Sequence, residues 1–308
     1  MVPAMEIRRG LLDDPRWLAA AIGGIVSAIA ALWAMRGLPL GFAAFWLTSL
    51  PIFAAGLGFG SGSAFGALGI GTLILLVLAS EWPTLIYLLG FALPALLMVA
   101  TGLRAGRLDG AGPLALTGIW PALVILLVAM LLAGSPGGFD GALIGSVKQG
   151  LTRMGIADAG MPVEQLARIM APAMAGWMVA ALILCGIGAQ SGLARRGMAL
   201  AANPRWSETH LPIWYGFLPS GAALVWLSGL GGDSSLPFAL FVVLLLPFFL
   251  LGLAAVHRRS AGRTARPFML GVFYAGLVIL SVPAAIAVTA FGIFEQWGRR
   301  NQPPGGMT

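Results

Sequence analysis

The residues of this chain that could do chemistry stand at the ends of long apolar runs. Glu81 and Trp82 precede Pro83 in one short polar turn, and Asp233 lies in another, within GLGGDSS. If a small solute enters from the outer side of a membrane, these three residues are the candidate ligand-binding groups. The alternative is that they only mark the ends of membrane spans, where acidic residues are common.

Other catalytic and metal chemistry is not indicated. His210 and His257 are far apart at the edges of apolar runs, and Cys185, the single cysteine, lies inside one. The sequence has no G-x-S-x-G, no H-E-x-x-H and no glycine-rich loop ending in Gly-Lys-Ser/Thr. We therefore expect no enzyme activity, no catalytic residue, no metal site and no cofactor.

The apolar runs themselves predict the fold. From Gly37 to Ser80 the chain has 44 residues without one charge, and only 9% of all residues are charged. About 20 apolar residues cross a bilayer as a helix, so this run holds two crossings. The sequence predicts an all-α, polytopic transmembrane helical bundle of eight to nine spans. The expected spans are 17–35, 39–58, 61–80, 83–103, 114–134, 171–192, 212–231, 235–256 and 268–294.

The basic residues predict an orientation. Cytoplasmic loops of membrane proteins are enriched in Lys and Arg. With nine spans and a cytoplasmic amino terminus, twelve of the 18 basic residues fall inside. Arg299 and Arg300 are the misfit, because nine spans place them outside. The net charge of +7 is thus assigned to loops at a lipid bilayer, and no nucleic-acid partner is expected.

The only long connection divides the chain into parts. We expect a cytoplasmic segment at 1–16, a first bundle of five spans at 17–134, an amphipathic loop at 135–168, a second transmembrane part at 169–294 and a polar tail at 295–308. In the loop, apolar residues recur at helical spacing. They are Leu143, Ile144, Val147, Leu151 and Met154. A helix on the bilayer surface explains them; a lid or partner-binding segment is the alternative.

Small residues repeat at four-residue spacing in two places. Gly58, Gly62 and Gly66 form one series, and Ala20, Gly24 and Ala28 form another on the first span. Such faces let helix backbones approach closely. Packing within the chain is one interpretation, and docking on another membrane protein is the other.

Several segments, in order along the chain, resemble the YybS-like bacterial membrane proteins, the domain-of-unknown-function 2232 family. They are LTSLPIFAAGLGFG, LPIWYGFLPSGAAL, FFLLGLAAVHRRS and FGIFEQWGRR. The resemblance implies a protein of the bacterial cytoplasmic (inner) membrane without an assigned reaction. The amino-terminal half of such proteins is also similar to the substrate-binding subunits (S components) of energy-coupling-factor vitamin transporters. In those subunits small residues of the first helix dock on a coupling subunit, a role that Ala20, Gly24 and Ala28 would match.

Two functions follow from these observations. The first is a transport-associated subunit that binds a small, largely neutral solute among its helices, with a partner supplying energy. The second is a structural or assembly protein that binds another membrane protein or lipid and moves no solute. For the first function, the absence of charge from the spans weighs against proton-coupled transport.

Overall fold

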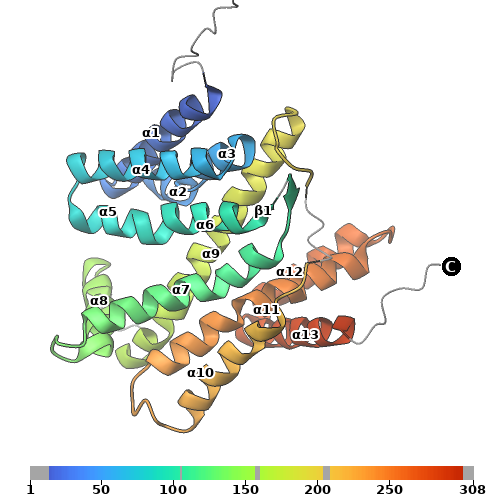
Figure 1. Ribbon diagram of the computed structural model, residues 1–308. Helices are drawn as coiled ribbons and strands as arrows, with labels where there is room; N and C mark the ends of the chain where they lie inside the picture. The colour runs from blue at the N-terminus through green and yellow to red at the C-terminus, as the bar shows by residue number, and fades with distance from the viewer. Residues whose placement is uncertain (1–13, 105, 157–159, 204–208, 301–308) are drawn as a thin grey trace, which may run out of the picture. The chain divides into compact units, whose positions relative to one another are not determined.

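The structure is a computed structural model that describes residues 14–104, 106–156, 160–203 and 209–300, with the side chains of Arg299 and Arg300 excepted. These residues are nearly all helical (Figure 1). Their only strands are β1 (Leu103–Arg104) and β2 (Arg107–Leu108), which pair antiparallel. The expectation of an all-α fold is confirmed.

Two compact units make up the chain, and each is described by itself. The first unit contains residues 1–109 and 178–204, and the second contains 110–177 and 205–308. The division differs from the five-span first part expected over 17–134. The fifth apolar helix, α7 (Ala111–Leu131), packs on α11 (Leu236–Ser260) of the second unit, and α9 (Val163–Arg195) contributes its last residues to the first unit.

The first unit is built around α1 (Pro15–Met35). Asp14 caps this helix by accepting a hydrogen bond from the Arg16 amide, and Pro15 suits its first turn. The other elements follow in chain order. They are α2 (Gly41–Leu47), α3 (Leu50–Phe59), α4 (Ser61–Leu78), α5 (Glu81–Tyr87), the π-helix η2 (Leu88–Ala92) and α6 (Leu93–Gly102). The buried face of α1 contacts α3 and α4, and it consists of small residues.

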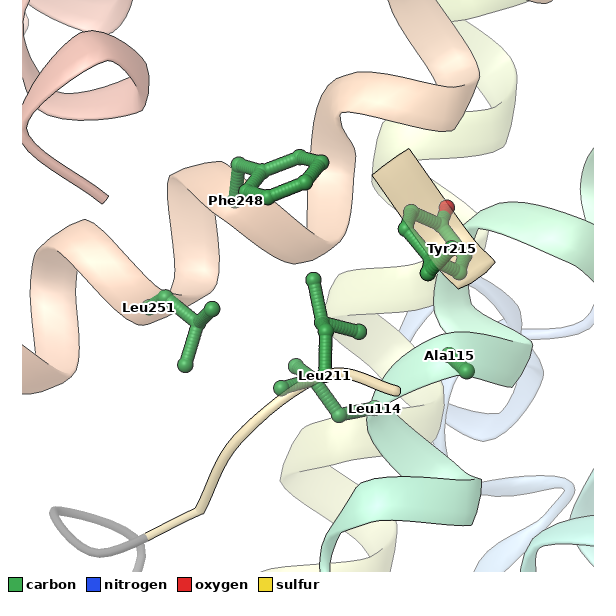
Figure 2. Close-up of a cluster of buried hydrophobic side chains, with 6 residues drawn as sticks. All are labelled: Leu114, Ala115, Leu211, Tyr215, Phe248 and Leu251. Atoms are coloured by element: carbon green, nitrogen blue, oxygen red, sulfur yellow. The ribbon is translucent and has the colours of Figure 1, made fainter. Parts of the chain in front are cut away.

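The second unit is built around α11. Its other elements are α7, α8 (Gly138–Arg153), the 3₁₀ helix η4 (Ile213–Gly216), α10 (Phe217–Leu227), α12 (Arg266–Leu280) and α13 (Val282–Arg300). Helices α7, α10 and α13 pack on α11. Figure 2 shows an apolar cluster that joins α7, η4 and α11. In it Tyr215 and Phe248 meet edge to face, with ring centroids 5.8 Å apart. The remaining members of the cluster are Leu114, Ala115, Leu211 and Leu251.

Within the part of the chain that the structure describes, seven helices are long and apolar enough to cross a membrane. They are Pro15–Met35, Gly41–Phe59, Ser61–Leu78, Glu81–Gly102, Ala111–Leu131, Val163–Arg195 and Leu236–Ser260. Ile213–Leu227 and Arg266–Leu280 are apolar but shorter. At 1.5 Å per residue, helices of this length cover about 22 Å of a hydrocarbon layer of about 30 Å. The protein thus has the helices of a multi-pass membrane protein.

The last apolar run is not one helix. The expected span 268–294 is divided between α12 and α13, because Ser281 adopts a positive φ of 43° that no helix accommodates. Pro283, in the next turn, also prevents α12 from continuing, since it has no amide hydrogen. The run 268–294 is therefore not one continuous helix.

The amphipathic segment in the long connection is helical, as expected. It forms α8, and Pro162 precedes the start of α9. Asp140 in the first turn of α8 accepts hydrogen bonds from the amide (3.0 Å) and the hydroxyl of Ser235, just before α11. This end of the second unit thus joins the α7–α8 connection to the α10–α11 connection.

The opposite end of the second unit gathers the ends of α11 and α13. Glu295 of α13 forms ion pairs with Arg258 and Arg259 at the end of α11. Beside it, the amide of Gln296 is bonded to both backbone groups of Leu211, at 2.7 and 3.1 Å. Helices α12 and α13 therefore form a hairpin whose far end returns to the level at which α11 ends.

Candidate functional site

The most unusual feature of the first unit is a break in the middle of a membrane helix. Between α2 and α3, Thr48 and Ser49 interrupt the helix Gly41–Phe59. Pro51 explains the position, because a proline has no N–H to bond the carbonyl of Leu47 four residues earlier. At a rise of 1.5 Å per residue, the break lies about 10 Å from the first end of the segment and about 15 Å from the other. Irregular backbone at that depth must find its hydrogen bonds inside the protein.

Side chains from two other elements supply some of these hydrogen bonds. The hydroxyl of Ser27 on α1 donates to the Thr48 carbonyl at 2.7 Å. Because this uses the only proton of Ser27, the hydroxyl of Tyr87, 3.0 Å away, is the donor to Ser27. Ser27 and Tyr87 are both fully buried. The break, α1 and α5 are thus joined by one chain of uncharged hydrogen bonds.

A second irregularity lies beside the first. Residues Leu88–Ala92 form a π-helical turn, and the hydroxyl of Ser49 donates to the carbonyl of Phe91 in it at 3.2 Å. Pro94 lacks the N–H that would bond the Gly90 carbonyl, so the regular helical ladder is interrupted here too. Single π turns inside α-helices are frequent at functional sites.

Cys185 of α9 forms a hydrogen bond to the backbone beside the break. Its thiol donates to the Trp46 carbonyl at 3.1 Å, and the backbone amides of Ser49 and Leu50 approach the same sulfur. The side chain is only 2% exposed. A cysteine that the sequence connected with no function is thus part of the polar cluster formed by Ser27, the break and Tyr87.

One hydroxyl near this cluster keeps unused hydrogen-bonding capacity. Within the described residues, the buried Thr72 hydroxyl on α4 has no hydrogen-bond partner. Its neighbour Gly71 faces Tyr87 so closely that a Cβ there would lie 2.2 Å from the phenolic oxygen. Only glycine at position 71 leaves room for that hydroxyl.

The residues predicted to meet a solute lie elsewhere. Glu81 and Trp82 are exposed in the first turn of α5, and Asp233 is exposed in the connection between α10 and α11. Glu81 and Asp233 belong to different units. None of the three contributes to the hydrogen bonds around the break.

Most of the predicted small residues pack within the first unit. Ala20 and Ala28 are buried, and a Cβ on Gly24 would lie 2.6 Å from the Ala67 carbonyl of α4. A Cβ on Gly66 would lie 2.8 Å from that of Ala20. The small face of α1 is therefore covered by α4.

The two other glycines of that series differ from each other. A Cβ on Gly58 would lie 3.2 Å from Leu193 of α9, in the same unit. Gly62 is exposed, and nothing within 4 Å would meet a Cβ there. Gly62 consequently takes no part in close packing.

The second unit contains a partly buried acid that the sequence did not single out. Partial burial would raise the pKa of Asp140, but hydrogen bonds from Ser235 and Ser234 and the positive charge of Arg168 outweigh it. The pKa of this carboxyl consequently lies below its ordinary value. Its partners are 28 to 95 residues away in sequence, which is why no local motif indicates the contact.

The second unit also has an open, almost entirely apolar groove of about 590 Å³ between α7, α10 and α11. Leu123, Ala222 and Leu240 are among the residues that line it.

Comparison with models of known protein families gave no match, and comparisons with curated proteins and with solved structures gave none either. The resemblance to the YybS-like family stays a prediction.

Proposed function

We propose that this chain is a transport-associated, multi-pass protein of the bacterial inner membrane that binds a small, largely neutral solute at the break in Gly41–Phe59. One observation carries the proposal: uncharged polar groups of α1, η2 and α9 converge on interrupted helix backbone half-way along a membrane span. Binding sites of membrane carriers are typically formed by discontinuous helices near the bilayer midplane.

The chemistry of the cluster favours a neutral solute. Its donors and acceptors are hydroxyls, a thiol and backbone groups, and the residues that form these bonds carry no charge. A charged solute would lose its hydration there without gaining an opposite charge. Hydroxyl or amide groups of a solute would instead exchange with the bonds of Ser27 and Tyr87, and Thr72 offers one further donor and acceptor.

Energy for transport would come from elsewhere. The sequence has no phosphate-binding loop, so a separate ATPase or an ion gradient must drive any movement. A coupling subunit would have to dock on a surface other than the Ala20–Gly24–Ala28 face, because α4 covers that face.

The test is ligand-dependent thermal stabilisation of the purified protein with a library of vitamins and other neutral metabolites. A solute that binds at the break should raise the melting temperature of the wild type and should do so far less for Ser27→Ala or Tyr87→Phe. Thr101→Ala is the matched control, because the Thr101 hydroxyl bonds only within its own helix, α6. Equal responses of all four proteins, or no response to any compound, would contradict the proposal.

An assembly protein without a solute is the second candidate. It is favoured by the fact that most polar groups at the break already have partners within the chain, as a purely structural joint would. Recovery of a stoichiometric membrane partner from native membranes, whose binding survives Ser27→Ala, would favour this function over the first.

We further propose eight crossings with a cytoplasmic amino terminus. These are the seven long helices and the short Ile213–Leu227, followed by an α12–α13 hairpin that returns to its own side. The ion pairs of Glu295 at the end of α11 support this arrangement. It brings Arg299 and Arg300 to the cytoplasm and raises the basic residues there from twelve to fourteen of 18.

A further inference from the structure

The connection between α11 and α12 concentrates positive charge. Arg258, Arg259, Arg263 and Arg266, here called the arginine turn, lie within nine residues. Glu295 is the acid that pairs with two of them, Arg258 and Arg259. Arg259 also lies over the ring of Phe291, 4.6 Å from its centroid. Four positive charges against one negative charge leave a net charge of +3 on this group.

Arg263 and Arg266 are the members of the arginine turn whose side chains remain available to bind a ligand. Both are exposed, and neither side chain has an ion pair or hydrogen bond to another described residue. The first turn of α12, which begins at Arg266, contains no acidic residue. The chain thus holds two guanidinium groups three positions apart in sequence, and neither is paired with an acid among the described residues.

Helix α12 fixes the surroundings of these arginines. None of its residues is buried, and Phe268 and Val278 are 74% and 78% exposed. An apolar helix that its own protein leaves unburied needs an apolar surrounding, which lipid acyl chains supply. Arg266, its first residue, must therefore lie where acyl chains give way to lipid head groups.

We propose that the arginine turn binds the phosphate of an anionic phospholipid, with Arg263 and Arg266 as the contacting residues and α12 seated among the acyl chains. The planar guanidinium group donates two parallel hydrogen bonds to phosphate oxygens. Anionic lipid head groups attract each nearby basic residue enough to strengthen binding about fivefold. Phospholipids and free phosphate both present phosphate oxygens. We assign the site to the phospholipid.

The experiment uses the full-length protein, delipidated in detergent and titrated with phosphatidylglycerol or with phosphatidylcholine of the same acyl chains, with melting temperature as the readout. We expect phosphatidylglycerol to stabilise the wild type at lower concentration than phosphatidylcholine. The double variant Arg263→Gln/Arg266→Gln should need roughly 25-fold more phosphatidylglycerol, at about fivefold per arginine. Lys148→Gln/Arg153→Gln, which removes two charges from α8, should behave as the wild type.

Three results would overturn the assignment. The first is equal phosphatidylglycerol affinity of the double variant and the wild type, and the second is equal affinity of the wild type for both lipids. The third is an identical stabilisation by inorganic phosphate alone, which would make free phosphate the ligand. The melting temperature of each variant without lipid shows whether it is folded before titration.

Discussion

Ser27 lies near the middle of α1 and is fully buried in the protein. Its hydroxyl donates a hydrogen bond to the carbonyl of Thr48 and at the same time accepts one from the hydroxyl of Tyr87. A buried acceptor that loses its donor costs more than a donor–acceptor pair removed together. The two hydroxyls should thus differ in their importance for stability.

Ser27→Ala should lower the free energy of unfolding by about 2 to 3 kcal/mol, because it leaves both the Thr48 carbonyl and the Tyr87 hydroxyl without a partner. Tyr87→Phe removes one hydrogen bond together with its donor and should cost about 1 kcal/mol. Unfolding in mixed detergent micelles measures both values. A larger effect of Tyr87→Phe than of Ser27→Ala would contradict this order.

Asp140 should make stability depend on pH. Because its folded pKa lies below the ordinary value, its contribution is fully present above the ordinary range near pH 4 and is lost as pH falls through the folded pKa. At pH 7 Asp140→Asn should therefore melt at a lower temperature than the wild type. Its free energy of unfolding should be lower by no more than about 1 kcal/mol, since this partly exposed carboxyl is screened by solvent.

Melting curves between pH 3 and pH 8 check this expectation. The difference between wild type and Asp140→Asn should shrink below pH 4, where the wild-type carboxyl also becomes neutral. Asp233→Asn changes an exposed carboxyl in the neighbouring connection and is the control. A constant difference at every pH would show that charge on Asp140 is not the cause.

At the scale of elements, α11 and α13 approach each other through glycines. A Cβ on Gly292 would lie 1.9 Å from the Phe248 carbonyl, and one on Gly252 would lie 2.0 Å from the Val288 carbonyl. Backbone atoms cannot rotate away as a side chain can. The position of α13, and with it that of Glu295, depends on these two residues having no side chain.

Gly292→Ala should force α11 and α13 apart and destabilise the protein by about 2 kcal/mol or more. Gly276→Ala is the matched control on α12, where a Cβ would meet nothing within 4 Å. There the better helix propensity of alanine should leave stability unchanged or raise it by up to about 1 kcal/mol. Thermal or detergent unfolding of the two variants distinguishes these outcomes.

The helices were predictable from sequence, whereas the polar cluster was not. A run of 20 uncharged apolar residues has few alternatives to a membrane helix, because its backbone must satisfy its own hydrogen bonds. Ser27, Tyr87 and Cys185 have no such signal, since they are separated by tens of residues and share no spacing. Pro51 and Pro94, each inside an apolar run, were the available indications of interrupted helices. Pro283 likewise indicated the interruption at Ser281, between α12 and α13.

At the scale of the whole molecule, the number of crossings decides on which side the chain ends. Eight crossings and a returning hairpin bring the carboxyl terminus to the cytoplasm, whereas nine crossings would leave it outside. The same proposal puts α8 outside, because it follows the fifth crossing. The two segments are expected on opposite sides of the membrane.

Single cysteines in a Cys185→Ser background test this arrangement in intact cells with a membrane-impermeant maleimide. Lys148→Cys should react before permeabilisation, and Thr308→Cys should react only after it. A second cysteine at Arg153 provides a control for access to α8. Labelling of Thr308→Cys in intact cells would contradict the eight-crossing proposal.

The long separation between Cys185 and the break has a consequence for biosynthesis. The Trp46 carbonyl receives its thiol donor from a residue 139 positions later in the chain. The first four apolar helices leave the ribosome well before α9. During that interval the break between α2 and α3 lacks the thiol that later donates a hydrogen bond beside it. Until α9 is inserted, the Trp46 carbonyl must do without its thiol donor or take a hydrogen bond from water or lipid polar groups.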